Sequence, residues 1–369
     1  MERWVECSRR LRQSLAASGY GGLLTCRLEH LRYVSPYQPP FSSSINLRVA
    51  AIVTPDVTRI FVPQIDLMGL QEVAAGRFEA AALPINQAAW PEILQAALDE
   101  LVPAQETIAV DLVPAHVMTE IARDVVFDST PWEEARLIKT PGEVASIRAG
   151  LGMVAAGMEA ALATAKPGAT ELQVAAAAEH AVRLAGAEGL AFFTLCSTNG
   201  DIVRRRFATD RVLAPGDDVF VDIGAVHDGY SAEFSRSVII GDAVTPEQRG
   251  IHQTAYRANR AMMAAIRPGA MASDLDRAAR EVILASPYAA LIHRHVTGSG
   301  IGLLLQERPI VSDPFDGGVD ELIAAGMVLN VEPGVYHLEI GGLRAEDIVL
   351  VTETGCELLT PYPYDPRLI

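Results

Sequence analysis

The sequence predicts a two-domain α/β protein, with an α/β domain over residues 1–135 and a mixed α+β domain over residues 136–369. Three observations lead to this fold class. The chain of 369 residues is too long for one small core. Apolar runs of strand length alternate with helical segments in the first third. In the remainder, the order turn, helix, strand, acid occurs twice, which indicates two half-domains related by a pseudo-two-fold axis.

The first domain begins with an amphipathic helical pattern over residues 2–18. Apolar runs of strand length follow it at Gly21–Thr25, Arg48–Thr54, Arg59–Pro63 and Thr107–Leu112. Helical patterns lie between these runs, and this alternation is typical of an α/β domain.

A strong helix start marks the entry into the second domain. In the segment Thr140-Pro141-Gly142-Glu143, threonine can cap the helix, proline suits its first turn, and glutamate can complete a capping box. We therefore place the domain boundary just before this segment, near residue 135.

The second domain contains an internal repeat. Lys166-Pro167-Gly168-Ala169 and Arg267-Pro268-Gly269-Ala270 are similar turns, and each precedes a helical pattern. An apolar strand pattern that ends in an acid follows each helix, at Asp222 in VFVDIG and at Glu332 in MVLNVEPG. A further acid follows in each half: Glu233 and Glu346.

The repeat predicts that these four carboxylates meet at one centre. The plain alternative is that they are strand-end acids that face solvent. Converging carboxylates must bind a cation, pair with arginine or share protons, because like charges a few ångströms apart cannot all stay ionised.

Composition excludes several classes of function. The net charge of −16 would repel a phosphate backbone, so we expect no nucleic-acid partner. No uncharged apolar run reaches about 18 residues and the N-terminus lacks a signal-peptide pattern, so we expect no membrane association. The 4 cysteines are scattered without metal-ligand spacing, which favours a reducing cytoplasm.

Several segments, taken in order, resemble the pita-bread fold family of creatinase, aminopeptidase P and prolidase. They are ARLIKTPGEVASIR, VDIGAVHDGYSAEFSRSV, HRHVTGSGIGLLLQERP, MVLNVEPGVY and GLRAEDIVLVTETG. The resemblance covers residues 136 to about 360 and implies a catalytic pita-bread domain. The preceding domain is similar to that of creatinase and aminopeptidase P.

The resemblance implies a set of metal ligands, because peptidases of this fold bind two divalent ions through two aspartates, one histidine and two glutamates. The acids of that set fall on Asp222, Glu233, Glu332 and Glu346. Ser299 takes the place of the metal-binding histidine, Gln306 replaces a further family histidine, and His295 is retained. The remaining oxygen ligands suit at most one ion (Mn, Mg or Fe), or none, better than a dinuclear pair.

Creatinase is the family's metal-free branch, and the resemblance is closest in character to it. Arg205 takes the place of the creatinase proton-shuttling histidine, and arginine cannot act as a general base at neutral pH. Arg48 takes the place of an arginine that reaches the partner subunit's site, and Gln306 that of a second arginine that binds the substrate carboxylate. The sequence leaves open whether Arg204, Arg205 or Arg206 faces the site.

These features favour an enzyme that hydrolyses a C–N bond of an amide, amidine or guanidino group in a small anionic or zwitterionic metabolite. Glu332 and Glu233 would orient the substrate and activate water, and His295 would transfer the proton. The residues expected to bind substrate are Arg48, Arg205, Gln306 and Ser299.

Three other functions remain open. They are a metal-dependent Xaa-Pro peptidase with one ion among the four acids, a lyase acting on a small zwitterion, and a catalytically inactive binding module. The identity of the substrate and the presence of a metal are not decided by the sequence. A homodimer is expected, because the creatinase-like segment SINLRVAAIV contains Arg48.

Overall fold

The computed structural model describes residues 2–38, 49–293, 295–312 and 319–369, and Arg48 lies outside them. The predicted mixed α/β fold class is confirmed, and the chain forms two compact units, Met1–Thr140 and Pro141–Ile369. The boundary predicted near residue 135 falls inside a helix, Thr130–Leu137, which belongs wholly to the first unit. The second unit begins at Pro141, where the predicted helix start lies.

The first unit is built on a six-stranded sheet in the order β4-β3-β2-β1-β5-β6. Its strands are β1 (Gly22–Thr25), β2 (Ala50–Val53), β3 (Thr58–Pro63), β4 (Glu79–Leu83), β5 (Ile108–Val110) and β6 (Val125–Phe127). Its helices are α1 (Glu2–Ser18), α2 (Leu28–Val34), α3 (Gln64–Ala74), η1 (Gln87–Ala89), α4 (Trp90–Leu101), α5 (Ala115–Glu120) and α6 (Thr130–Leu137).

The central strands of this sheet are apolar on both faces. Every residue of β1 and β2 is buried, and β1 pairs in parallel with β5. Trp90 and Leu94 of α4 pack in the same core cluster as Leu24 and Ile52 of the sheet. A strand with buried side chains on both faces needs a continuous apolar run, which explains why these strands were evident in the sequence.

The second unit contains the two predicted halves. The first has α7 (Pro141–Thr164), α8 (Glu171–Leu184), β7 (Gly189–Leu190), β8 (Leu195–Thr198), α9 (Asp201–Arg204), β9 (Asp218–His227) and β10 (Tyr230–Ile239). The second has α10 (Pro246–Ala265), α11 (Ala272–Leu284), η2 (Ala289–Leu291), β11 (Gly298–Gly300), β12 (Glu307–Val311), β13 (Val328–Val331), β14 (Gly334–His337), β15 (Gly341–Arg344), β16 (Asp347–Val351) and β17 (Cys356–Leu358).

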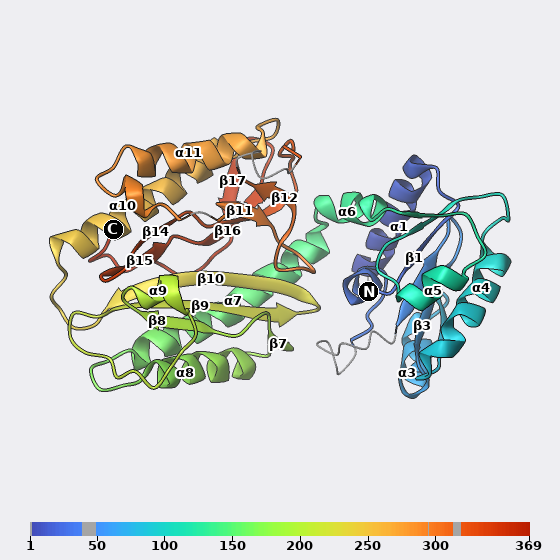
Figure 1. The fold of residues 1–369 in the computed structure, drawn as a ribbon, viewed down its shortest axis with the longest axis horizontal. Helices are drawn as coiled ribbons and strands as arrows, with labels where there is room; N and C mark the ends of the chain where they lie inside the picture. Colours follow the sequence, from blue (N-terminus) through green and yellow to red (C-terminus); the bar gives the residue numbers. More distant parts are fainter. Residues whose placement is uncertain (1, 39–48, 294, 313–318) are drawn as a thin grey trace. The chain divides into compact units, whose positions relative to one another are not determined.

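The two halves repeat one arrangement, a pair of helices followed by strands. Figure 1 shows the strands of this unit lying between the pair α7 and α8 and the pair α10 and α11. In the first half β7, β8 and β10 all pair antiparallel with β9, and in the second the sheet order is β12-β11-β13-β16-β17. The second helix of the first half begins with a capping box in which Thr170 and Gln173 bond reciprocally.

A tight hairpin fixes the register of β9 and β10. Asp228 and Gly229 form its two-residue turn, and both have positive φ, at 52° and 80°. This turn suits the right-handed twist of paired strands. The register places Asp222 opposite Ser235 and Glu233 opposite Gly224, so both acids lie on one face of the hairpin. The eleven-residue spacing of the acids follows from this geometry.

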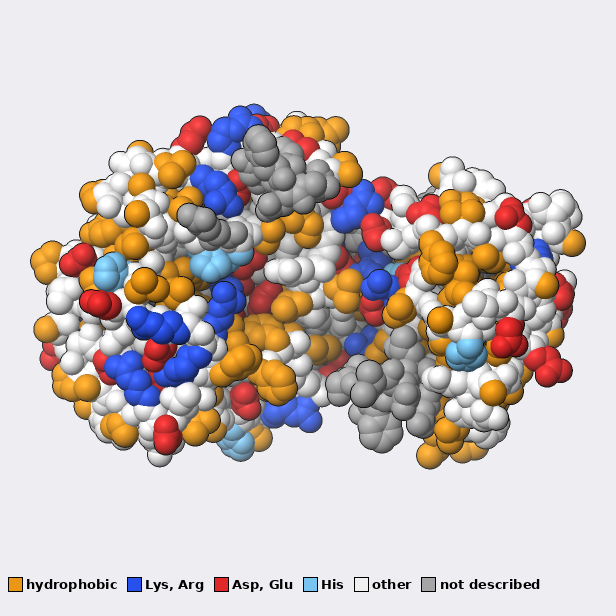
Figure 2. All heavy atoms as spheres, viewed as in Figure 1, with side chains coloured by type: hydrophobic (Ala, Val, Ile, Leu, Met, Phe, Trp, Pro, Cys, Tyr) orange, Lys and Arg blue, Asp and Glu red, His pale blue; other side chains and the backbone are white. Residues whose placement is uncertain are grey.

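The surface mixes charges of both signs. On the face seen in Figure 2, acidic and basic side chains are interspersed with apolar ones. Among the helices of the described residues, none combines the length and the apolar character needed to cross a membrane.

Helix α7 approaches both α8 and β9 closely at Gly157. A Cβ atom at this position would lie 2.5 Å from Cγ2 of Val182 and 3.1 Å from Cδ1 of Ile223. Glycine is therefore required here by space, since a side chain would push α7 away from the strand that carries Asp222.

We expect Gly157→Ala to lower the free energy of unfolding by about 1–3 kcal/mol, because the methyl group overpacks this contact. Gly152 lies on the same helix, and among the described residues no atom lies within 4 Å of its added Cβ. Gly152→Ala should raise stability by about 0.5–1 kcal/mol through helix propensity. Urea denaturation of both variants measures the difference. Equal effects would contradict a close approach at Gly157.

Candidate functional site

The four acids singled out in the sequence come together in the second unit. Asp222 lies on β9 and Glu233 on β10, whereas Glu332 follows β13 and Glu346 precedes β16. All four are buried, with at most 5% of each residue exposed. Carboxylate oxygens of Asp222, Glu233 and Glu346 lie within 4.8 Å of one another. The alternative of solvent-facing strand-end acids is therefore excluded.

An arginine that the sequence analysis did not single out, Arg344, lies among these acids. Its guanidinium forms ion pairs with Asp222, with Glu346 at 3.2 Å and with Glu332 at 3.6 Å. The side chain is 12% exposed. One buried cation thus contacts three of the four carboxylates.

Burial of the acids changes their protonation. Burial is the largest influence on Asp222 and raises its pKa to about 7, although the charge of Arg344 lowers it. Burial likewise raises the pKa of Glu332 to about 8, against the charge of Arg344. The pKa of Glu233 is raised well above its ordinary value by burial and by its neighbours Glu346 and Asp222. The cluster therefore holds protons or attracts a further cation near neutral pH.

A second residue missed in the sequence, Asn330, also contacts the acids. Its amide nitrogen donates to Glu233 at 3.0 Å and to Glu346 at 2.8 Å. The strand period of two could have revealed both missed residues. Asn330 precedes Glu332 by two positions and Arg344 precedes Glu346 by two, the spacing at which an extended backbone turns side chains to the same side.

Buried polar atoms without partners surround this cluster. Within the described part of the chain, no hydrogen-bond partner is present for Oδ1 of Asp222, Oε1 of Glu332 or Oγ of Ser299. Ser299 is fully buried on β11, directly opposite Asn330 of β13. Buried polar groups are costly when unsatisfied, so these atoms indicate room for an ion, water or substrate.

His295 lies beside the cluster and is uncharged at neutral pH. Burial, followed by the charge of Arg344, lowers its pKa to about 4. Its Nε2 atom has no hydrogen-bond partner among the residues described, and its ring lies 3.9 Å from that of His293. Nδ1 of His295 donates to the Val296 carbonyl, so in the neutral ring the open Nε2 can only accept a hydrogen bond, for instance from a substrate N–H group. Gln306, predicted to bind substrate, is exposed.

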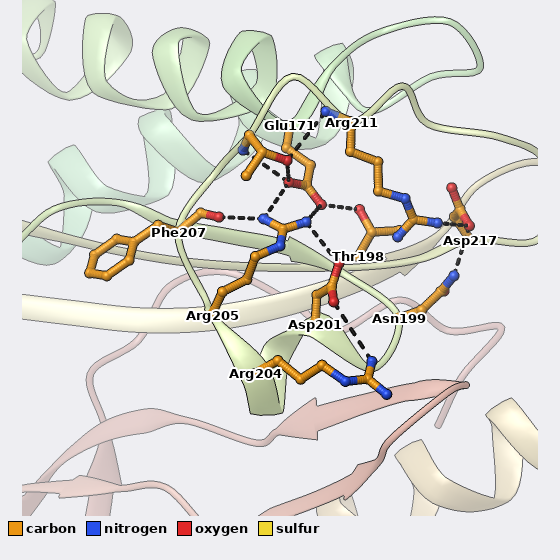
Figure 3. Close-up of polar contacts among 10 residues, drawn as sticks. Glu171, Thr198, Asn199, Asp201, Arg204, Arg205, Phe207, Arg211 and Asp217 are labelled. Carbon is orange, nitrogen blue, oxygen red and sulfur yellow. Dashed lines mark hydrogen bonds and ion pairs between the residues drawn. The ribbon is translucent and has the colours of Figure 1, made fainter.

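Arg205 does not face the acids, contrary to the predicted substrate contact. Figure 3 shows its guanidinium turned toward Glu171. The two terminal nitrogens of Arg205 donate to the Glu171 carboxylate at 2.9 and 3.1 Å, to Asp201 at 2.8 Å and to the Phe207 carbonyl at 2.7 Å. All four terminal N–H groups are thus used within the protein, which leaves none of them for a substrate carboxylate.

Among Arg204, Arg205 and Arg206, Arg206 is the one whose charge influences the pKa values of the acids. Arg204 pairs with Asp201 at 3.7 Å (Figure 3), whereas Arg206 is exposed and has a positive φ of 61°. This backbone conformation turns the chain sharply after α9. The charge of Arg206 lowers the pKa of Asp222 and of Glu332, although burial, the larger influence, raises both.

Glu171 anchors the loop that carries these arginines. Its carboxylate is fully buried and also accepts hydrogen bonds from Thr198 at 2.7 Å and from the Thr209 hydroxyl at 2.7 Å. Burial raises its pKa, but the hydrogen bonds from Arg205, Thr198 and Thr209 outweigh this and lower it overall. Its stabilising effect is therefore present above the ordinary pKa of 4.5 and lost as the pH falls through the lowered value.

We expect Glu171→Gln to lower the free energy of unfolding by about 1–3 kcal/mol at neutral pH, because an amide nitrogen cannot accept these hydrogen bonds. The stability that the wild type gains from ionised Glu171 is lost at low pH. The difference in free energy of unfolding between the wild type and the variant should therefore shrink as the pH falls. Urea denaturation at several pH values measures this. The control is Glu357→Gln, which breaks an exposed pair with Arg148 and should cost less than about 1 kcal/mol. Similar losses in both variants would contradict the anchoring role.

Comparison with known proteins relates this geometry to a family. The model for metallopeptidase family M24 matches residues 145–353. The "Probable dipeptidase PepE" of Mycobacterium tuberculosis is 31% identical over 334 residues, which is 86% of this chain and 85% of the relative. The "Xaa-Pro dipeptidase" of Pyrococcus furiosus is 33% identical over 229 residues, or 62% of this chain and 64% of that protein, so the match spans less than two thirds of its length.

Solved structures agree with this relationship over the whole chain. The Xaa-Pro dipeptidase from Bacillus anthracis has a TM-score of 0.85 at 23% identity and covers 98% of this chain and 99% of its own. Dipeptidase PepE from Mycobacterium ulcerans has a TM-score of 0.82 at 27% identity and covers 98% of this chain and 96% of its own.

These findings correct the functional interpretation of the sequence. The main hypothesis, a creatinase-like hydrolase of a small metabolite, is wrong, because the relatives are named as dipeptidases. It gave too much weight to the loss of the family histidines at Ser299 and Gln306 and too little to the four retained acids. With its pita-bread fold and its four converging acids, the chain belongs to metallopeptidase family M24.

Proposed function

We propose that this protein is a metal-dependent peptidase that hydrolyses Xaa-Pro dipeptides. The observation that carries the proposal is the buried convergence of Asp222, Glu233 and Glu346, whose oxygens lie within 4.8 Å of one another. Membership of the M24 family and the names of the relatives support the same reaction class.

The residues present fit one hard divalent ion. Asp222, Glu233, Glu332 and Glu346 would hold it, and carboxylate oxygens are the ligands that Mg²⁺ and Mn²⁺ prefer. The unpartnered Oδ1 atom of Asp222, considered within the described residues, is consistent with such an ion. Ser299 offers a hydroxyl where the family pattern has an imidazole, so the set is rich in oxygen and poor in nitrogen.

An ion in this site would polarise the scissile carbonyl and make a bound water easier to deprotonate. Glu332 is the candidate general base, because the charge of a bound ion would lower its raised pKa and its Oε1 atom, without a partner among the described residues, could then accept a proton. Arg344 holds Asp222 and Glu346 in fixed positions. His295, uncharged at neutral pH and donating from Nδ1 to the Val296 carbonyl, would accept a hydrogen bond from the substrate at Nε2.

The free carboxylate of a dipeptide requires a cation near the acids. Arg206 is exposed and its charge acts on Asp222 and Glu332, so we assign it to that carboxylate. A planar guanidinium can bind a carboxylate through two parallel hydrogen bonds. This contact would favour dipeptides over longer peptides, whose terminal carboxylate lies further from the scissile bond.

We expect the purified protein to hydrolyse Xaa-Pro dipeptides when Mn²⁺ is added and to lose this activity after chelation. Glu332→Gln should lower kcat by a factor on the order of 10²–10⁴, because it removes the proposed base. The exposed Glu357→Gln should leave kcat unchanged. The measurement is release of proline from a panel of Xaa-Pro dipeptides. No release with any divalent ion, from protein shown to be folded, would refute the proposal.

We expect Arg206→Ala to raise KM for Xaa-Pro dipeptides about tenfold with little change in kcat, because it removes binding to a group that does not react. Hydrolysis of the same dipeptides with an amidated C-terminus should not change. Arg204→Ala is the matched control, since Arg204 is the neighbouring exposed arginine and pairs with Asp201. An equal rise in KM for free and amidated dipeptides would exclude the assigned contact.

A further inference from the structure

Asn330 has an unusual position for a neutral side chain. It is 1% exposed and lies on β13 between Ser299 of β11 and Ile348 of β16. Its amide nitrogen donates to Oε1 of Glu233 at 3.0 Å and to Oε1 of Glu346 at 2.8 Å. Because an amide nitrogen carries two hydrogens, both of them are used between these two carboxylates.

Two buried carboxylates this close need positive charge or a donor between them. Asn330 supplies donors at one oxygen of Glu346, and Arg344 contacts the other, Oε2, at 3.2 Å. Both oxygens of Glu346 are thus bonded to protein groups. These two donors occupy about half of the acceptor sites of the Glu346 carboxylate, which favours binding of one ion over a bridge between two.

The residue opposite Asn330 points to the same conclusion. Ser299 stands where the family pattern has a metal-binding histidine, and its hydroxyl is fully buried. The two neighbouring positions therefore lack an imidazole ligand and contain an amide donor instead. Serine is a weaker ligand for a divalent ion than histidine, so neither position favours a second ion.

We infer that the Asn330 amide takes the place of a second cation between Glu233 and Glu346, so that the centre holds a single divalent ion. The inference rests on the proposed metal-dependent function, which it makes more specific. Asn330 is a positioning residue in this arrangement, since it acts through the two glutamates.

The test counts bound ions without using a substrate. The full chain is stripped with a chelator and dialysed against Mn²⁺, and the bound ion is counted by elemental analysis and native mass spectrometry. We expect the wild type to saturate at about one ion per chain. Asn330→Thr combined with Ser299→His should bind about two, because the donor is removed and a nitrogen ligand is added.

Asn330→Asp provides a second test that preserves the shape of the side chain. It replaces the donor with a further carboxylate, so the metal-free variant should have a lower melting temperature than the wild type. Added Mn²⁺ should raise that melting temperature more in the variant than in the wild type. The control is Asn259→Ser, since Asn259 is also buried but donates to the backbone carbonyls of Val331 and Ala345.

Two results would overturn the inference. One is a wild type that binds two ions. The other is loss of the ion in Asn330→Thr alone, with Asn259→Ser unchanged, because Asn330 would then be a ligand through its oxygen. The count is independent of catalysis. A protein that binds one ion and cleaves no dipeptide refutes the proposed function alone, and an active protein with two ions refutes this inference alone.

Discussion

The contacts of Arg344 with Asp222, Glu332 and Glu346 are the interaction on which the rest of the site depends. Four carboxylates lie buried around one centre, and an uncompensated buried charge costs several kcal/mol or more. A planar guanidinium can contact several acids at once, and it remains protonated beside them. The amide nitrogen of Asn330 adds a hydrogen bond to the carboxylate of Glu233. These donors offset part of the repulsion among the acids that the strands of the two halves bring together.

The duplicated architecture explains why the acids arrive in pairs. In the first half, the Asp228-Gly229 turn sets the register that puts Asp222 and Glu233 on one face of β9 and β10. In the second half, Glu332 and Glu346 lie at the ends of neighbouring strands, β13 and β16. Arg344 contacts both of them, and Asn330 donates to Glu346 and to Glu233 of the first half. The site is therefore a product of backbone register, and small shifts of α7 against β9 at Gly157 would disturb it.

The site departs from its family in a consistent direction. Ser299 and Gln306 stand where the family resemblance led us to expect imidazoles, and Arg204, Arg205 and Arg206 lie at the end of α9 and directly after it. Glu171 binds Arg205 and thereby fixes the loop after α9 (Figure 3). Of the arginines in this run, Arg206 is the one whose charge influences the acids, and its effect on Asp222 is smaller than that of Arg344. Loss of a nitrogen ligand suggested a change of reaction, but the relatives are dipeptidases. Oxygen ligands suffice for a hard ion, so the same reaction class is compatible with the altered set.

The sequence by itself determined the α/β fold class, the duplication and the four acids that converge. These features depend on local patterns, such as apolar strands, a capped helix start and an acid at each strand end, and such patterns are visible in one dimension. Only the tertiary structure decided that Arg205 turns to Glu171, that Arg344 and Asn330 donate to the acids, and that His295 is uncharged. The physical reason is that side-chain direction and protonation depend on neighbours from distant segments, whose distances and burial exist only after the strands have packed.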